Sequence, residues 1–65
     1  MSVTKREGAQ CAKDHLTNAE RSARRARKLF EDIGDPEGAK QAGEAEKASS
    51  GAKRYVERRL GKDEN

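Results

Sequence analysis

Small and apolar residues recur along the first half of the chain at alternating intervals of three and four positions. The series is uninterrupted and consists of Ala9, Ala12, Leu16, Ala19, Ala23, Ala26, Phe30 and Ile33. This is the heptad spacing of helices that pack against a partner along their whole length. The pattern therefore predicts one long helix over residues 5–33 with an Ala-rich seam.

Start and stop signals stand at both ends of this segment. Thr4 followed by Glu7 matches the S/T-x-x-E capping box that begins a helix. Gly34 can take the left-handed conformation that closes one. Asp35 is a good N-cap, and Pro36 suits the first helical position because its missing N–H has no partner there. We therefore expect a link of only two residues, 34–35, and a second helix from residue 36.

A second stripe follows the link at the same helical spacing. It consists of Ala42, Ala45, Ser49, Ala52, Val56 and either Arg59 or Leu60. Gly61 is expected to end the second helix near residue 60, and residues 62–65 to form a frayed tail. The chain is thus predicted to be one all-α domain spanning residues 1–65.

So short a link forces the two helices to fold back as an antiparallel hairpin. The expected seam pairs are Phe30 with Gln41, Ala26 with Ala45, Ala23 with Ala48, Ala19 with Ala52, and Leu16 with Tyr55. Alanine then meets alanine through the middle, which allows a close approach of the helices. One edge of the hairpin is expected to carry the opposite-charge pairs Arg27–Glu46 and Glu20–Lys53.

The other edge of the predicted hairpin is almost uncharged and carries Leu29, Ala48, Tyr55 and His15. An exposed apolar strip beside a thin core is typical of a contact surface. We expect two hairpins to pair through it into a four-helix bundle, as a homodimer, or one hairpin to dock on another protein.

Composition supports a need for such a partner. Only 31% of the 65 residues are hydrophobic and 42% are charged, so a single hairpin buries little apolar surface. One cysteine cannot form an intramolecular disulfide. No apolar run is long enough to span a membrane, and the first ten residues lack the apolar core of a signal peptide. We therefore expect a soluble, cytoplasmic protein with no membrane partner.

Basic residues cluster on predicted outward faces. The first cluster lies in the run 21–28, which contains no acid, and the second lies near the end of the second helix; the candidate contacts are Arg21, Arg24, Arg25, Lys28, Arg54 and Arg58. Lys and Arg on rigid helices neutralise phosphates, which gives sequence-independent affinity for DNA or RNA. The alternative is a plain solvated face, which a net charge of only +3 also allows.

Residues for catalysis or metal binding are few. Cys11 and His15 lie four apart on one helix face, so two copies could supply four zinc ligands, but a half-buried thiol and a His beside Tyr55 explain the same residues. The chain has one His, one Cys and no Gly-rich phosphate loop, and a two-helix hairpin offers no concave pocket. We expect no enzyme activity, no cofactor and no metal site.

The stretch LFEDIGDPEGA, residues 29–39 within the segment 26–45, resembles the junction between repeats in tetratricopeptide-repeat proteins. That resemblance implies a protein-interaction role. In overall plan the chain is also similar to Rop-type helical hairpins, which regulate plasmid copy number, dimerise into four-helix bundles and bind RNA.

These observations favour a small non-enzymatic regulator that self-associates and binds nucleic acid through its basic helix faces. The alternative is an adaptor or inhibitor that docks the hairpin on a protein partner.

Overall fold

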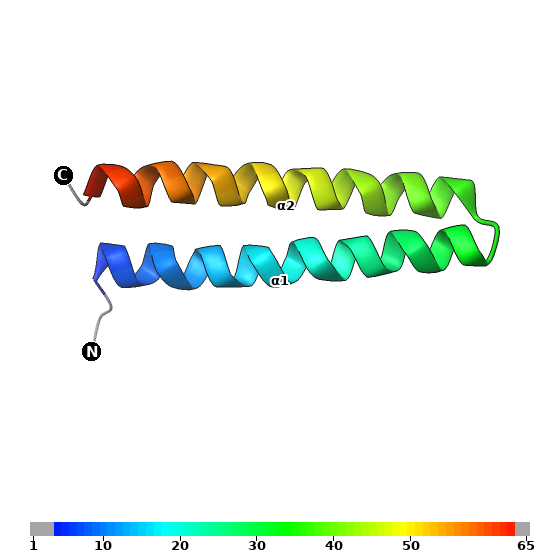
Figure 1. Ribbon diagram of the computed structural model, residues 1–65, viewed down its shortest axis with the longest axis horizontal. Helices are drawn as coiled ribbons and strands as arrows, with labels where there is room; N and C mark the ends of the chain where they lie inside the picture. The colour runs from blue at the N-terminus through cyan, green and yellow to red at the C-terminus, as the bar shows by residue number, and fades with distance from the viewer. Residues whose placement is uncertain (1–3, 64–65) are drawn as a thin grey trace.

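The computed structural model describes residues 4–63, with side chains described for 4–61, and this part of the chain is entirely helical outside the cap and the link. Helix α1 spans Lys5–Asp32 and helix α2 spans Pro36–Asp63. They pack against each other and run antiparallel side by side, so the start of α1 and the end of α2 lie at the same end of the hairpin (Figure 1). The predicted all-α hairpin is confirmed, but α1 ends one residue earlier than predicted, so the link is 33–35 rather than 34–35, with Ile33 as the C-cap.

The predicted signals at the start of α1 are formed as expected. The Thr4 hydroxyl accepts a hydrogen bond from the Glu7 backbone N–H at 3.1 Å, and the Glu7 carboxylate accepts one from the Thr4 N–H at 3.1 Å. This reciprocal capping box satisfies two N–H groups that the first turn of a helix leaves without partners.

The link closes α1 with a Schellman motif. Gly34 has φ of 74°, Asp35 donates its N–H to the Phe30 carbonyl at 2.8 Å, and Gly34 donates to the Glu31 carbonyl at 3.2 Å. The Asp35 carboxylate then accepts the Gly38 N–H at 3.0 Å and caps α2. The left-handed Gly34, the two backbone hydrogen bonds and the Asp35 cap together fix the reversal of the chain.

Helix α2 continues past the predicted stop. It passes through Gly61 to Asp63, whereas glycine at that position was expected to end it. Helix propensity is a weak signal of about 1 kcal/mol for glycine, and tertiary packing often outweighs it. Leu60, directly before Gly61, is buried in the contact with α1, which holds this turn in place. Residues 64 and 65 of the expected tail lie outside the described part.

The core of the hairpin is thin. Among the described side chains only Ala42, Val56 and Leu60 are buried, each 8% exposed. Leu16, Ala23 and Phe30 of α1 are half-buried on the facing surface. The predicted choice between Arg59 and Leu60 is resolved in favour of Leu60.

The predicted alanine-to-alanine seam is formed only in part, because Ala23 and Ala26 of α1 are half-buried while the α2 alanines expected opposite them are exposed. Several of its members are exposed: Ala12, Ala19 and Ile33 on α1, and Ala45, Ala48 and Ala52 on α2. Tyr55, expected against Leu16, is 57% exposed, and Ile33 is 73% exposed. Phe30 lies against Gly38 rather than beside Gln41, which is exposed.

Both helices are rotated about their axes toward the charged edge. Lys13, Glu20 and Arg27 on α1 are half-buried, as are Glu46 and Lys53 on α2. Long charged side chains bury their methylene stems against a helix while their heads stay solvated and paired. An alanine methyl offers less contact area, so the helices turn these longer side chains toward one another.

Candidate interaction surfaces

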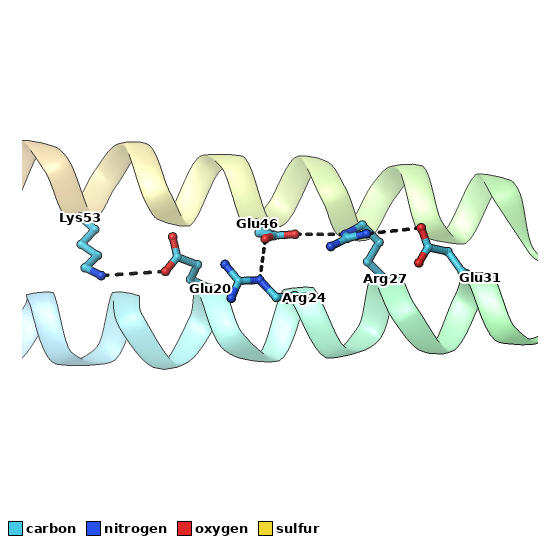
Figure 2. Close-up of polar contacts among 6 residues, drawn as sticks. All are labelled: Glu20, Arg24, Arg27, Glu31, Glu46 and Lys53. Atoms are coloured by element: carbon cyan, nitrogen blue, oxygen red, sulfur yellow. Dashed lines mark hydrogen bonds and ion pairs between the residues drawn. The ribbon is translucent and has the colours of Figure 1, made fainter.

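Ion pairs join the two helices along one edge of the hairpin. Arg27 Nε lies 3.2 Å from Glu46 Oε1, and Lys53 Nζ lies 3.9 Å from Glu20 Oε1, so both predicted pairs are confirmed. Lys13 Nζ also lies 3.6 Å from Glu57 Oε2. Figure 2 shows the central contacts in a row between the ribbons. We call this side of the hairpin the ion-pair edge.

Glu46 is the hub of the ion-pair edge, because two arginines of α1 bind its two oxygens. Arg24 Nε lies 2.9 Å from Oε2 and Arg27 Nε lies 3.2 Å from Oε1 (Figure 2). The hydrogen bond from Arg24 lowers the pKa of Glu46 below its usual 4.5, and Arg27 acts in the same direction, while desolvation opposes them. The hydrogen bond with Glu46 likewise raises the pKa of Arg27.

We expect the hairpin to lose stability in acid. A carboxyl whose pKa is lowered by folding stabilises the folded state above its ordinary pKa of 4.5, and this contribution is lost as pH falls through the lower folded-state value. Urea unfolding followed by circular dichroism should show a lower midpoint at about pH 3 than at about pH 7.

Glu46→Gln is the matched variant for this titration. It should unfold more easily than wild type at neutral pH, and its midpoint should change less with pH. Some dependence should remain, because hydrogen bonds with Thr4 also lower the pKa of Glu7. An equal pH dependence in the two proteins would contradict the role given to Glu46.

The side opposite the ion-pair edge carries no charge over most of its length. The residues of the ion pairs Glu20–Lys53 and Arg27–Glu46 each lie four positions after a residue of the helix–helix seam, and they define one side of the hairpin. Residues that lie three positions after a seam residue are therefore on the other side. There we find Ala12, His15, Ala19, Ser22, Ala26, Leu29 and Ile33 from α1, and Gln41, Ala45, Ala48, Ala52 and Tyr55 from α2. We call this surface the uncharged face.

The uncharged face contains the large apolar side chains that the hairpin leaves in solvent. Leu29, Ile33 and Tyr55 are 64%, 73% and 57% exposed, and they are the exposed large hydrophobic residues of the described chain. All four predicted contact residues, Leu29, Ala48, Tyr55 and His15, lie on it and are exposed. The structure thus places all four on the same exposed face.

Five of the six candidate nucleic-acid contacts have exposed side chains whose positive charge is not paired. Within the described residues no hydrogen bond or ion pair engages the side chains of Arg21, Arg25, Lys28, Arg54 and Arg58. Arg54 also lines the groove along the ion-pair edge, and all five side chains lie outside the uncharged face. Arg24 differs, because its guanidinium is held by Glu46.

Sequence reasoning missed the double role of Glu46 and most of the uncharged face. Arg24 precedes Arg27 by three positions, so the two share a helix face, and the predicted Arg27–Glu46 pair already placed the acid within reach. The larger face was hidden because its alanines were assigned to the helix–helix seam. The sequence pattern that could have revealed this face is a second helical stripe without charged residues in a chain that is 42% charged.

An open groove lies along the ion-pair edge between the helices. Its lining includes Arg24, Lys40, Glu44, Lys47 and Arg54, so it is charged and mixed in sign rather than apolar. Such a groove differs from the concave, largely apolar sites that bind small substrates.

Cys11 and His15 are both exposed on α1. Over the described residues no group of three or more His, Cys, Asp or Glu side chains is arranged to hold a metal ion. Within the same part of the chain, neither helix has the length and apolarity needed to cross a membrane.

Comparison with known proteins gives no relative. No family model, curated protein or solved structure matches the chain. The similarity to tetratricopeptide-repeat junctions and to Rop-type hairpins therefore stays a prediction.

Proposed function

We propose that the chain is a small non-enzymatic regulator that self-associates through its uncharged face and binds the backbone of RNA or DNA through its basic outer faces. The observation that carries the nucleic-acid part is the free charge of Arg21, Arg25, Lys28, Arg54 and Arg58. Three acids of the hairpin, Glu20, Glu46 and Glu57, pair with other bases across the helices and leave these five side chains unpaired.

The two activities use different sides of the hairpin, so they are compatible. Burial of the uncharged face by a second copy gives a four-helix bundle, and the basic outer faces stay in solvent. Contacts from lysine and arginine on rigid helices would be to phosphates and would carry little sequence information. The single tyrosine and single phenylalanine offer little for base stacking, and Phe30 is committed to Gly38.

The test is the salt dependence of nucleic-acid binding. We expect the triple variant Arg21→Gln, Arg25→Gln, Lys28→Gln to bind a mixed-sequence duplex more weakly. Its log–log salt slope should be smaller by roughly 2 to 3, because each phosphate that a side chain neutralises adds about 0.9 to the slope. Fluorescence anisotropy over a salt series measures both quantities. Self-association of the triple variant should equal that of wild type, and an unchanged slope would contradict the assignment.

A protein partner on the uncharged face is the second candidate, favoured by the exposure of Leu29, Ile33 and Tyr55. Tyr55→Glu separates the two hypotheses. If the wild-type chain is monomeric and a partner protein binds the uncharged face, Tyr55→Glu abolishes capture of that partner. If the wild-type hairpin is a dimer, Tyr55→Glu lowers the solution mass.

A further inference from the structure

The uncharged face is arranged symmetrically about its own centre. Ser22 and Ala48 mark that centre on the two helices. On α1, Leu29 and His15 lie seven positions to either side of Ser22, and on α2, Tyr55 and Gln41 lie seven positions to either side of Ala48. Between them the face is made of small residues. Reversal about this centre therefore brings each end of the face over the opposite end of the same face in a second copy.

We propose that a second copy of this chain docks on the uncharged face in the reversed orientation, which we call head to tail. The two-fold axis that relates the copies lies near Ser22 and Ala48, and Arg59 of each copy pairs with the partner's Glu37. This inference rests on the self-association proposed above and specifies its orientation. In it α1 lies over the partner's α1 and α2 over the partner's α2, and the turn of each hairpin lies toward the open end of the other.

Charge complementarity selects this orientation. The turn carries Glu31, Asp32, Asp35 and Glu37 with no base between residues 29 and 39. The open end of α2 carries exposed Arg58 and Arg59, which have no ion pair among the described residues. Arg59 lies eleven positions after Ala48 and Glu37 eleven before it, so reversal about Ala48 places opposite charges together at both ends of α2.

The alternative orientation, turn over turn, keeps the same faces together but lacks this match. It places α1 over the partner's α2, which sets Asp32 near the partner's Glu37 and gathers the acids of both turns at one end. Like charges at an interface oppose association and act as specificity elements against the wrong orientation.

The reversed copy also overlaps the uncharged face along most of its length. Leu29 then lies over the partner's His15, Ile33 near the partner's Cys11 and Ala12, and Tyr55 over the partner's Gln41. The overlap of 12–33 is roughly 31 Å long at 1.5 Å per residue, and two helices are about 20 Å wide. Each copy thus buries roughly 600 Å², or about 1,200 Å² in total, which is at the lower end of specific protein interfaces.

Charge reversal distinguishes the two orientations. Glu37→Lys should weaken the wild-type dimer about tenfold in Kd, because two rim pairs change from attractive to repulsive. Arg59→Glu should be weakened similarly. An equimolar mixture of these two proteins should dimerise more tightly than either variant alone, because the heterodimer pairs the new lysine of one chain with the new acid of the other. Sedimentation equilibrium measures all three.

Controls keep the result specific to the interface. Asp14→Lys makes the same kind of charge change on an exposed outer position of α1 and should alter Kd less than about twofold. Circular dichroism verifies that each variant remains helical, since Glu37 accepts a hydrogen bond from Gln41 at 3.0 Å within the first turn of α2. Ser22→Cys in a Cys11→Ser background supplies a second readout, because only head-to-tail docking brings the two Ser22 positions together for disulfide crosslinking.

A wild-type chain that stays monomeric would overturn self-association and this docking together. A wild-type dimer that Glu37→Lys strengthens, or whose charge-reversed variants do not recover on mixing, would overturn the head-to-tail docking alone and leave the dimer in place.

Discussion

Leu60→Ala is expected to lower the free energy of unfolding by about 2 to 3 kcal/mol, because removing a buried leucine side chain costs both its transfer free energy and the cavity left behind. Leu60 is one of only three buried residues among the described side chains. Chains of this size rarely have more than about 3 to 5 kcal/mol from a single core. The variant should therefore keep only about 0 to 3 kcal/mol of stability, and urea unfolding followed by helical circular dichroism should show a much lower midpoint than wild type.

Leu29→Ala is the matched control, because it makes the same chemical change at a leucine that is 64% exposed. At concentrations where the chain is monomeric we expect a decrease below about 0.5 kcal/mol, the usual range for surface substitutions. At higher concentration the same variant should self-associate less than wild type. Equal destabilisation by the two variants in the monomer would contradict the burial pattern described above.

Gly38→Ala is expected to destabilise the hairpin by about 1 to 2 kcal/mol, although alanine is normally the better helix former. A methyl group on Gly38 would lie 2.7 Å from two ring carbons of Phe30, so the ring or the helices must move. Phe30 is half-buried and also takes part in closing α1 through its carbonyl. The displacement would thus affect the turn and the packing between the helices together.

Gly51→Ala is the control, and the effect should have the opposite sign. Nothing lies within 4 Å of a methyl group at this exposed helical position. The change should stabilise the chain by up to about 1 kcal/mol. Urea midpoints of the two variants should fall on either side of wild type, and a stabilised Gly38→Ala protein would show that the Phe30 ring does not pack closely on α2.

Local chemistry made much of the fold predictable from sequence. The capping box of Thr4 and Glu7, the left-handed Gly34 and the Asp35 cap each depend on residues within a few positions of one another. The opposite-charge pairs Arg27–Glu46 and Glu20–Lys53 also followed from the shortness of the link, because so short a turn makes the helices antiparallel and restricts their register. These features formed as predicted.

The rotation of the helices about their axes could not be read from spacing. Ala19 and Glu20 lie on opposite sides of the stripe that contains Leu16 and Ala23, and a heptad pattern allows either residue to face the other helix. The choice depends on how much surface each buries, and paired Glu20 and Lys53 bury long stems where Ala19 and Ala52 would bury methyl groups. The extension of α2 beyond Gly61 has a similar origin, since the burial of Leu60 outweighs the preference of glycine to end a helix.

The same rotation determines the candidate interaction surfaces. Turning the alanines away from the partner helix joins them to Leu29 and Tyr55 in one broad surface, where sequence analysis predicted only a narrow edge. It also draws Arg24 toward Glu46, so the free basic charge of α1 is concentrated on Arg21, Arg25 and Lys28.

The solution mass of the wild-type chain, measured by light scattering with and without a mixed RNA and DNA pool, tests the central claim most directly. We expect twice the chain mass of 7.2 kDa for the protein alone, and a further gain with nucleic acid at about 50 mM salt that disappears at about 200 mM. A mass of one chain at every concentration, unchanged by either nucleic acid at low salt, would contradict both halves of the proposed function.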